Sequence, residues 1–207
     1  VRRAATCREA HEIIPRSDAP RAPSPYGRPV STPERREAQV RRARLVAVVG
    51  VVLVTLYAVC AAVHALVLNP LAAVPGRTFG EIVDDIVASQ DALGTWTTLA
   101  VLVGGVLIAL TLLAITWLSA APRPCHVAAW FLGMLAAGSP ASFMASVGPA
   151  TAVADTYGVS GADASPSGLV LHLVSAVAFL ALVGVLVHDA RRVGPVGLSR
   201  GTASAAG

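Results

Sequence analysis

The sequence predicts an all-α integral membrane protein, built as a four-helix bundle with a short amphipathic helix in its first outer loop. Of its 207 residues, 55% are hydrophobic and only 14% are charged, whereas soluble domains carry about 25% charged residues. The apolar content is too high for a disordered chain, and three cysteines are too few for a disulfide scaffold. A small polytopic membrane protein is the class that remains.

Four charge-free stretches are long enough to cross the hydrocarbon of a bilayer, a thickness of roughly 30 Å that takes about 20 helical residues. They cover residues 45–68, 96–119, 127–148 and 169–188. Trp96 and Trp117 lie near the two ends of the second stretch, and indole rings favour the headgroup region. The third stretch is the most polar of the four, and we expect Pro140 to kink it.

The charges of the segments between these spans predict the orientation. Residues 1–44, 120–126 and 189–207 carry net charges of +6, +1 and +2, whereas residues 69–95 and 149–168 carry −3 and −2. Positively charged segments stay in the cytoplasm, so both termini are predicted to be cytoplasmic. All 16 basic side chains are arginine, which together with abundant Ala, Val, Gly and Pro indicates a GC-rich coding sequence. We therefore expect a multi-pass protein of a bacterial cell (inner) membrane.

Residues 1–44 are predicted to form a cytoplasmic arm, mostly disordered because it is rich in Arg and Pro, and residues 189–207 a cytoplasmic tail. Val30 offers an alternative GTG start, so residues 1–29 either form a flexible arm or precede the native protein. Thr32 caps a predicted helix that begins at Pro33. The arginines before the first span are expected to bind anionic lipid and not nucleic acid, since no aromatic residues are interleaved with them. They are Arg35, Arg36, Arg41, Arg42 and Arg44.

An amphipathic helix is predicted in the first outer loop, over residues 79–93. Thr78 and Glu81 fit a capping box at its start. Apolar residues then recur at helical spacing, so we expect this helix to lie across the outer mouth of the bundle or in the membrane interface. Asp84 and Asp85 are adjacent and point in different directions on a helix, which favours a solvated acidic face over a cation site.

Histidines are the candidate site residues. His64 and His172 lie at similar depth near the outer ends of the first and fourth spans. Imidazoles so placed could bind a b-type haem for electron transfer or relay protons, and the plainer interpretation is a neutral imidazole hydrogen-bonded near the interface. His126 and His188 form a second pair at the inner water boundary. Because 16 residues separate His172 from His188, the two point about 160° apart around the helix, which counts against two stacked haems.

No catalytic residue and no metal site is predicted. Cys60 and His64 share a helix face and Cys125 precedes His126, but two ligands do not make a metal site. The sequence contains no phosphate-binding loop, no HExxH motif and no serine nucleophile elbow. The four spans contain no Asp or Glu, which weighs against an ion-coupled carrier. No cofactor is therefore expected apart from haem b in the electron-transfer alternative.

Small and hydroxyl-bearing residues indicate close packing between the spans. The third span carries a seam of small residues at every fourth position, formed by Gly133, Ala137, Ala141 and Ala145. Such a seam lets helices approach closely and could also bind a membrane-protein partner. Hydroxyl groups in the other spans could hydrogen-bond between helices; they include Thr98, Thr111, Thr116 and Ser175.

These features describe a bundle and no reaction. We therefore expect a non-enzymatic accessory or interaction subunit in the membrane. One alternative is a haem-binding electron-transfer protein that uses His64 and His172. A second alternative is a small-molecule permeation protein, for which Pro140 and the polar third span are the support.

Overall fold

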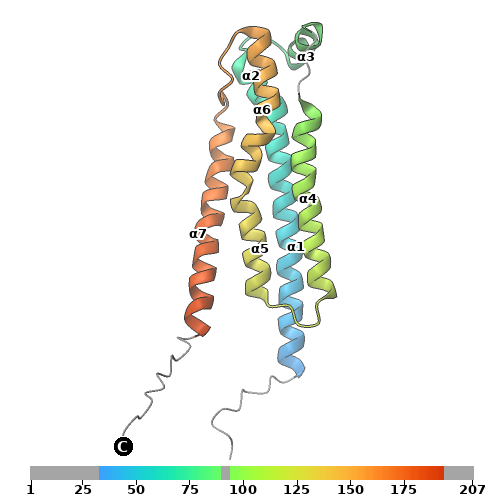
Figure 1. Ribbon diagram of the computed structural model, residues 1–207, viewed down its shortest axis with the longest axis vertical. Coiled ribbons are helices and arrows are strands. Elements are labelled where there is room, and N and C mark those ends of the chain that lie inside the picture. Colours follow the sequence, from blue (N-terminus) through green and yellow to red (C-terminus); the bar gives the residue numbers. More distant parts are fainter. Residues whose placement is uncertain (1–32, 90–93, 194–207) are drawn as a thin grey trace, which may run out of the picture. The chain divides into compact units, whose positions relative to one another are not determined.

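The computed structural model describes residues 33–89 and 94–193, and this part of the chain is helical without β-strands. Four helical segments are long and apolar enough to cross a membrane, as the sequence predicts. They run side by side along one bundle (Figure 1). The predicted arm before Pro33 and the tail after Val193 lie outside the described residues. The elements are α1 (Pro33–Val63), the π-helical η1 (His64–Leu68), α2 (Asn69–Ala73), α3 (Phe79–Ala88), α4 (Thr95–Leu118), α5 (Pro124–Ala136), α6 (Gly138–Tyr157) and α7 (Ser167–Val193).

The first segment continues farther than the predicted span. α1, η1 and α2 form one unbroken helix from Pro33 to Ala73, so the Asn69–Pro70 pair does not end it. Pro70 has no N–H to donate to the carbonyl four residues earlier. The helix is widened to π geometry just before it, where the Asn69 N–H donates to the His64 carbonyl. Pro33 is the first described residue and is helical, and its predicted cap Thr32 lies outside the described residues.

The third segment is two helices, α5 and α6, which meet at Ala137. This break lies just before Pro140, close to the predicted kink. Pro140 thereby falls in the first turn of α6, where a residue needs no backbone N–H partner. α6 then runs to Tyr157, well beyond the predicted end of the span at Gly148, so part of the predicted second outer loop is helical.

The helices are held together by small residues. α1 packs mainly against α4 and α5, α7 packs mainly along α5, and α6 packs mainly along α4. Ala43, Ala47 and Ala109 are fully buried in the core that these helices share. Gly50 lets α5 lie close to α1, because a Cβ at this position would overlap the ring of Phe131.

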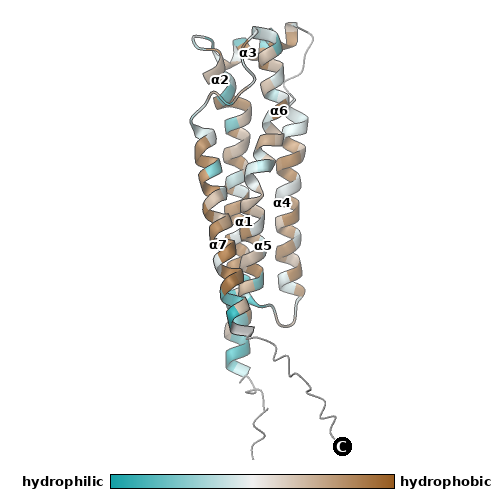
Figure 2. Ribbon diagram, turned by 60° about the vertical axis from the view of Figure 1, so that its left-hand side comes forward, coloured by the Kyte–Doolittle hydropathy of each residue, from teal (hydrophilic) through white to brown (hydrophobic). Residues whose placement is uncertain are grey.

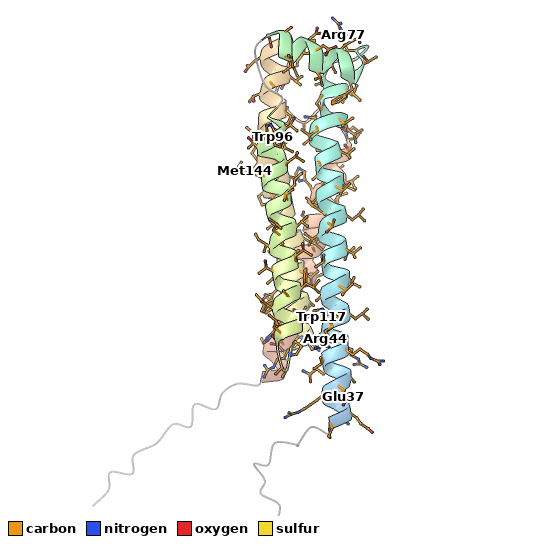
Figure 3. The ribbon with its side chains drawn as sticks, turned by 90° about the vertical axis from the view of Figure 1, so that its right-hand side faces the viewer. Glu37, Arg44, Arg77, Trp96, Trp117 and Met144 are labelled. Carbon is orange, nitrogen blue, oxygen red and sulfur yellow. The ribbon has the colours of Figure 1, made fainter. Side chains whose placement is uncertain are left out.

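The outward surface of the bundle is apolar. Large side chains such as Leu107 on α4 and Leu180 on α7 are more than half exposed, and hydrophobic residues dominate the middle of the bundle (Figure 2). Trp96 and Trp117 are exposed at opposite ends of α4 (Figure 3). At 1.5 Å per residue they lie about 32 Å apart along the helix, close to the thickness of a bilayer's hydrocarbon. This surface suits lipid contact around a multi-pass protein.

α3 lies at the same end of the bundle as α2 and α6 (Figure 1). The predicted capping box is confirmed: the Thr78 N–H donates to Glu81 Oε2 over 2.7 Å, and the Glu81 N–H donates to Thr78 Oγ1 over 3.3 Å. Ile82 and Ile86 are buried against α6. α3 therefore packs onto the bundle and ends at Ala88, and residues 90–93 of the predicted helix lie outside the described residues.

The two adjacent acids of α3 have different surroundings, as the helical spacing predicts. Asp85 accepts a hydrogen bond of 2.6 Å from the Tyr157 hydroxyl and lies 3.8 Å from Arg77 Nη2. Asp84 is exposed. Asp85 thus links α3 to the end of α6, and Asp84 faces away from this contact.

Candidate functional site

A cavity with both polar and apolar lining residues lies between η1, α6, α7 and the loop that precedes α7, at the same end of the bundle as α3. We call it the histidine cavity, because both His64 and His172 line it. Its volume is about 190 Å³. The sequence places these two histidines at one depth, and the structure brings them to one cavity. The other lining residues are Asn69, Ser142, Phe143, Ser146, Val147, Ala150, Thr151, Gly161, Ala162, Asp163, Gly168 and Leu171.

His64 is the buried member of the pair. Its side chain is held from both sides: Nδ1 lies 2.8 Å from Ser167 Oγ, and Nε2 lies 3.4 Å from Asp163 Oδ2. The residue is only 5% exposed. A buried imidazole needs partners for its ring nitrogens, and the segment before α7 supplies both. His64 therefore joins η1 to the start of α7.

His172 is the exposed member of the pair, one turn into α7. Its Nδ1 lies 2.7 Å from Ser139 Oγ, in the first turn of α6. No hydrogen bond occupies its Nε2 among the described residues. The break at Ala137 brings Ser139 to this position, because it starts α6 beside α7. His172 thus lies at the rim of the cavity with one nitrogen available to a ligand.

The loop before α7 is fixed to the cavity wall by Asn69 and Gly168. Asn69 is buried, and its Oδ1 accepts a hydrogen bond of 2.8 Å from the Ala164 N–H. Gly168 leaves room for Asp163, because a Cβ at this position would fall on the Asp163 carboxylate. The position of this loop therefore depends on an asparagine and a glycine that also line the cavity.

Asp163, His64 and Ser167 form a chain of the same residue types as a serine-hydrolase triad. Their arrangement does not make a nucleophilic site. Ser167 is not among the residues that line the histidine cavity, and it also lies 2.6 Å from Ser165 Oγ. A nucleophile must face the space that its substrate occupies. We therefore interpret this chain as a structural network that holds the loop.

The histidines at the other end of the bundle do not form a matching cavity pair. His126 Nε2 lies 3.6 Å from Asp189 Oδ2, and the Cys125 thiol donates to Asp189 Oδ1 over 3.8 Å. These three groups lie within 4.8 Å of one another and link the start of α5 to the end of α7. His188 is next to Asp189 in α7 and is exposed. Cys60, predicted to share a face with His64, is exposed on α1, whereas His64 is buried.

The predicted seam of small residues is divided by the break at Ala137. Gly133 on α5 faces α7, where a Cβ would lie 3.9 Å from Leu182. Ala145 on α6 is buried, and its carbonyl accepts a 2.6 Å hydrogen bond from Thr98 of α4. Ala137 is exposed and Ala141 is half-buried. Both ends of the seam therefore serve packing inside the chain.

The predicted arginine cluster lies on the first three turns of α1, at the opposite end of the bundle from the histidine cavity. Arg35, Arg41 and Arg42 are exposed. Arg44 lies over the ring of Trp117, with 4.9 Å between the guanidinium carbon and the ring centroid. Arg36 borders the same groove as Arg44.

Several residues of the histidine cavity were missed by sequence analysis. Asp163 lies in the loop after α6, and Ser142, Ser146 and Thr151 lie on α6. The polar character of the third span was the available signal, but it indicates no particular neighbour. No protein-family model, no curated protein and no solved structure matches this chain.

Proposed function

We propose that the chain is a non-enzymatic accessory or interaction subunit in a bacterial inner membrane, and that it receives a polar group of a membrane-protein partner in the histidine cavity. The observation that carries the proposal is the cavity itself. Two imidazoles, three hydroxyl-bearing side chains and Asp163 surround one space in a bundle whose middle is largely apolar on its outward side. Ionisable side chains such as histidine are costly inside a membrane bundle and are candidate functional residues there.

The size of the cavity favours a small polar occupant. Pockets for drug-sized ligands and cofactors range from about 300 to 1,000 Å³, whereas this one measures about 190 Å³. A single polar side chain fits that size. The available Nε2 of His172, together with the hydroxyl groups of Ser142 and Ser146, offers both donors and acceptors to such a group.

The partners of His64 support a binding role over catalysis of the serine-hydrolase kind. Ser167 lies outside the cavity lining, and both nitrogens of His64 already have partners. A general base needs a free nitrogen within reach of the proton that it removes. Both nitrogens of His64 are engaged by Ser167 and Asp163, so its role is to hold the loop that closes the cavity.

Filling the cavity tests the proposal. The tagged full chain is purified from native membranes in mild detergent, with Ser146→Phe as the blocked variant. Leu180→Phe is the matched control, because Leu180 is exposed on α7 and is not a lining residue. We expect a stoichiometric partner with the wild type and the control but not with Ser146→Phe. Equal recovery of that partner with all three proteins would refute the role of the cavity.

The haem alternative is favoured by one observation, which is that His64 and His172 border the same cavity. The partners at both nitrogens of His64 weigh against it, because a haem iron needs one of those nitrogens. An absorbance spectrum of the purified protein separates the two proposals. A Soret band that disappears in His64→Ala and in His172→Ala would replace the accessory role with electron transfer, and a colourless protein would end the haem alternative.

The permeation alternative has less support, namely the polar side of α6 that lines the cavity. Uptake of small polar solutes into vesicles that contain the purified chain would favour it. The proposed orientation, with both termini in the cytoplasm, is tested by a reporter fused after Gly207. Activity of a cytoplasm-dependent reporter would support the orientation, and activity of a periplasm-dependent one would overturn it.

A further inference from the structure

A groove lies between the arginine-rich start of α1 and the end of α4, far along the bundle from the histidine cavity. Its volume is about 650 Å³, within the range of roughly 300–1,000 Å³ that ligand sites occupy. We call it the arginine groove. It is lined by Arg36, Glu37, Val40, Arg41, Arg44, Leu45, Val48, Trp117 and Ala120.

The lining of the arginine groove changes from charged to apolar along α1. Arg36, Arg41 and Arg44 outnumber the single acid Glu37 at one end. Leu45 and Val48 follow directly, and they are 64% and 42% exposed. A ligand that matches this change from charged to apolar lining has an anionic head and an apolar tail, which is the chemistry of an anionic phospholipid.

Arg44 marks the border between the two parts. Its guanidinium lies over Trp117, 4.9 Å from the ring centroid (Figure 3). Among the described residues, its buried Nε has no hydrogen-bond partner. No carboxylate pairs with Arg44 in the part of the chain that the structure describes. A buried, unsatisfied guanidinium nitrogen is costly, and a turn of the Arg44 side chain into the groove would bring it to a phosphate oxygen, the acceptor that suits it best.

Arg44 and Trp117 lie at the position along the bundle where the headgroups of one leaflet are expected. Arg44 is the last charged residue before the apolar part of α1, and Trp117 lies at the corresponding end of α4 (Figure 3). Indole rings prefer the headgroup region of a bilayer. Phosphates of one leaflet would therefore lie at the height of the unsatisfied Nε.

We propose that the arginine groove binds one anionic phospholipid, with its phosphate on Arg44 and its acyl chain along Leu45 and Val48 beside Trp117. The site is defined by two helices, unlike the diffuse attraction of exposed arginines to a charged surface. The inference requires insertion into a membrane, but it is independent of the role proposed for the histidine cavity.

Quenching of Trp117 by brominated lipids tests this proposal. The full chain carries Trp96→Phe and Trp130→Phe, so that Trp117 is its only indole, and is placed in vesicles with increasing fractions of brominated phosphatidylglycerol. Brominated phosphatidylcholine serves as the zwitterionic comparison. We expect phosphatidylglycerol to bind next to Trp117 about fivefold more tightly, because both headgroups offer a phosphate but only that of phosphatidylglycerol carries a net negative charge for Arg44 to neutralise.

Two charge-matched variants distinguish a groove from a diffuse surface effect. Arg44→Gln is expected to remove the preference for phosphatidylglycerol, whereas Arg42→Gln keeps it, since Arg42 is exposed and does not line the groove. Arg44→Lys keeps the charge and should retain part of the preference, which controls for misfolding of Arg44→Gln. Equal quenching by the two lipids in the wild type, or equal losses in the Gln variants, would overturn the proposal.

Discussion

His64 Nε2 lies 3.4 Å from Asp163 Oδ2, which connects the π-helical stretch of the first segment to the loop before α7. The two side chains differ in exposure, at 7% for His64 and 42% for Asp163. The network around them also includes Ser167 and the packing of Gly168. Its contribution to stability should therefore be carried mainly by the buried imidazole.

Removing His64 should cost more than neutralising Asp163. We expect Asp163→Asn to lower the free energy of unfolding by less than about 1 kcal/mol, because its contact with His64 is partly solvated. His64→Ala should cost about 1–3 kcal/mol, because Ser167 loses one of its two hydroxyl or imidazole partners and a buried space is left. Unfolding in mixed micelles followed by circular dichroism measures both. His126→Ala, whose contact with Asp189 is half-exposed at the other end of the bundle, is the control and should change little. Equal losses in all three variants would contradict this account of the network.

Gly168→Ala should push the Asp163 side chain away from His64, since the new Cβ would fall on the Asp163 carboxylate. The expected loss is about 1 kcal/mol of unfolding free energy, because a partly exposed side chain moves and its contact with His64 is lost. Gly184→Ala is a matched control on the same helix, because nothing lies within 4 Å of a Cβ there. That control should be neutral or up to about 1 kcal/mol more stable. A Gly168→Ala protein as stable as the wild type would show that the loop is not held in this position.

Gly50→Ala should weaken the contact between α1 and α5, because its Cβ would overlap the ring of Phe131. The expected cost is about 1–3 kcal/mol. Phe131→Leu in the same chain should recover part of that loss, since a smaller side chain leaves room for the methyl group. The coupling energy from the double-mutant cycle is the measurement. Strictly additive losses would mean that the two residues do not pack together.

The capping box of α3 should depend on pH. Hydrogen bonds from the Thr78 backbone and side chain lower the pKa of Glu81 below its usual 4.5. A carboxyl whose pKa is lowered in the folded state stabilises the helix at pH values above 4.5. That stabilisation is lost as the pH falls through the lower, folded value. An NMR titration of the Glu81 carboxyl carbon should show the lowered pKa in the wild type and a less lowered pKa in Thr78→Val, which keeps the backbone N–H donor and loses only the hydroxyl. An unchanged midpoint in that variant would contradict the assigned cause.

The sequence was sufficient to predict those features that depend on local chemistry. Hydropathy identifies four spans because each must bury its backbone polar groups in its own helix. The capping box at Thr78 and Glu81 is a local pattern and is confirmed. The helices continue to Ala73 and Tyr157, beyond the predicted span ends at Leu68 and Gly148, because a π-helical stretch and neighbouring helices accommodate residues that would end a helix in water.

The candidate site was predicted only in part. Its two histidines followed from depth along the spans, but Asp163 and Ser167 depend on how the loop folds back onto η1. The acceptors of the threonine hydroxyls did not follow from the sequence either. Thr98 donates across to α6, whereas Thr111 and Thr116 donate to carbonyls of their own helix. A serine or threonine can satisfy itself locally, so its presence in a span does not identify a neighbour.

The break at Ala137 gives the two halves of the third segment different neighbours. α5 remains with α1 and α7, whereas α6 turns toward α4. Along the histidine cavity α6 has α4 as its main neighbour, whereas α5 packs mainly along α7 and α1 at the other end of the bundle. The residues that line the histidine cavity and those that line the arginine groove have no member in common. A substitution in the lining of one therefore leaves the lining of the other unchanged.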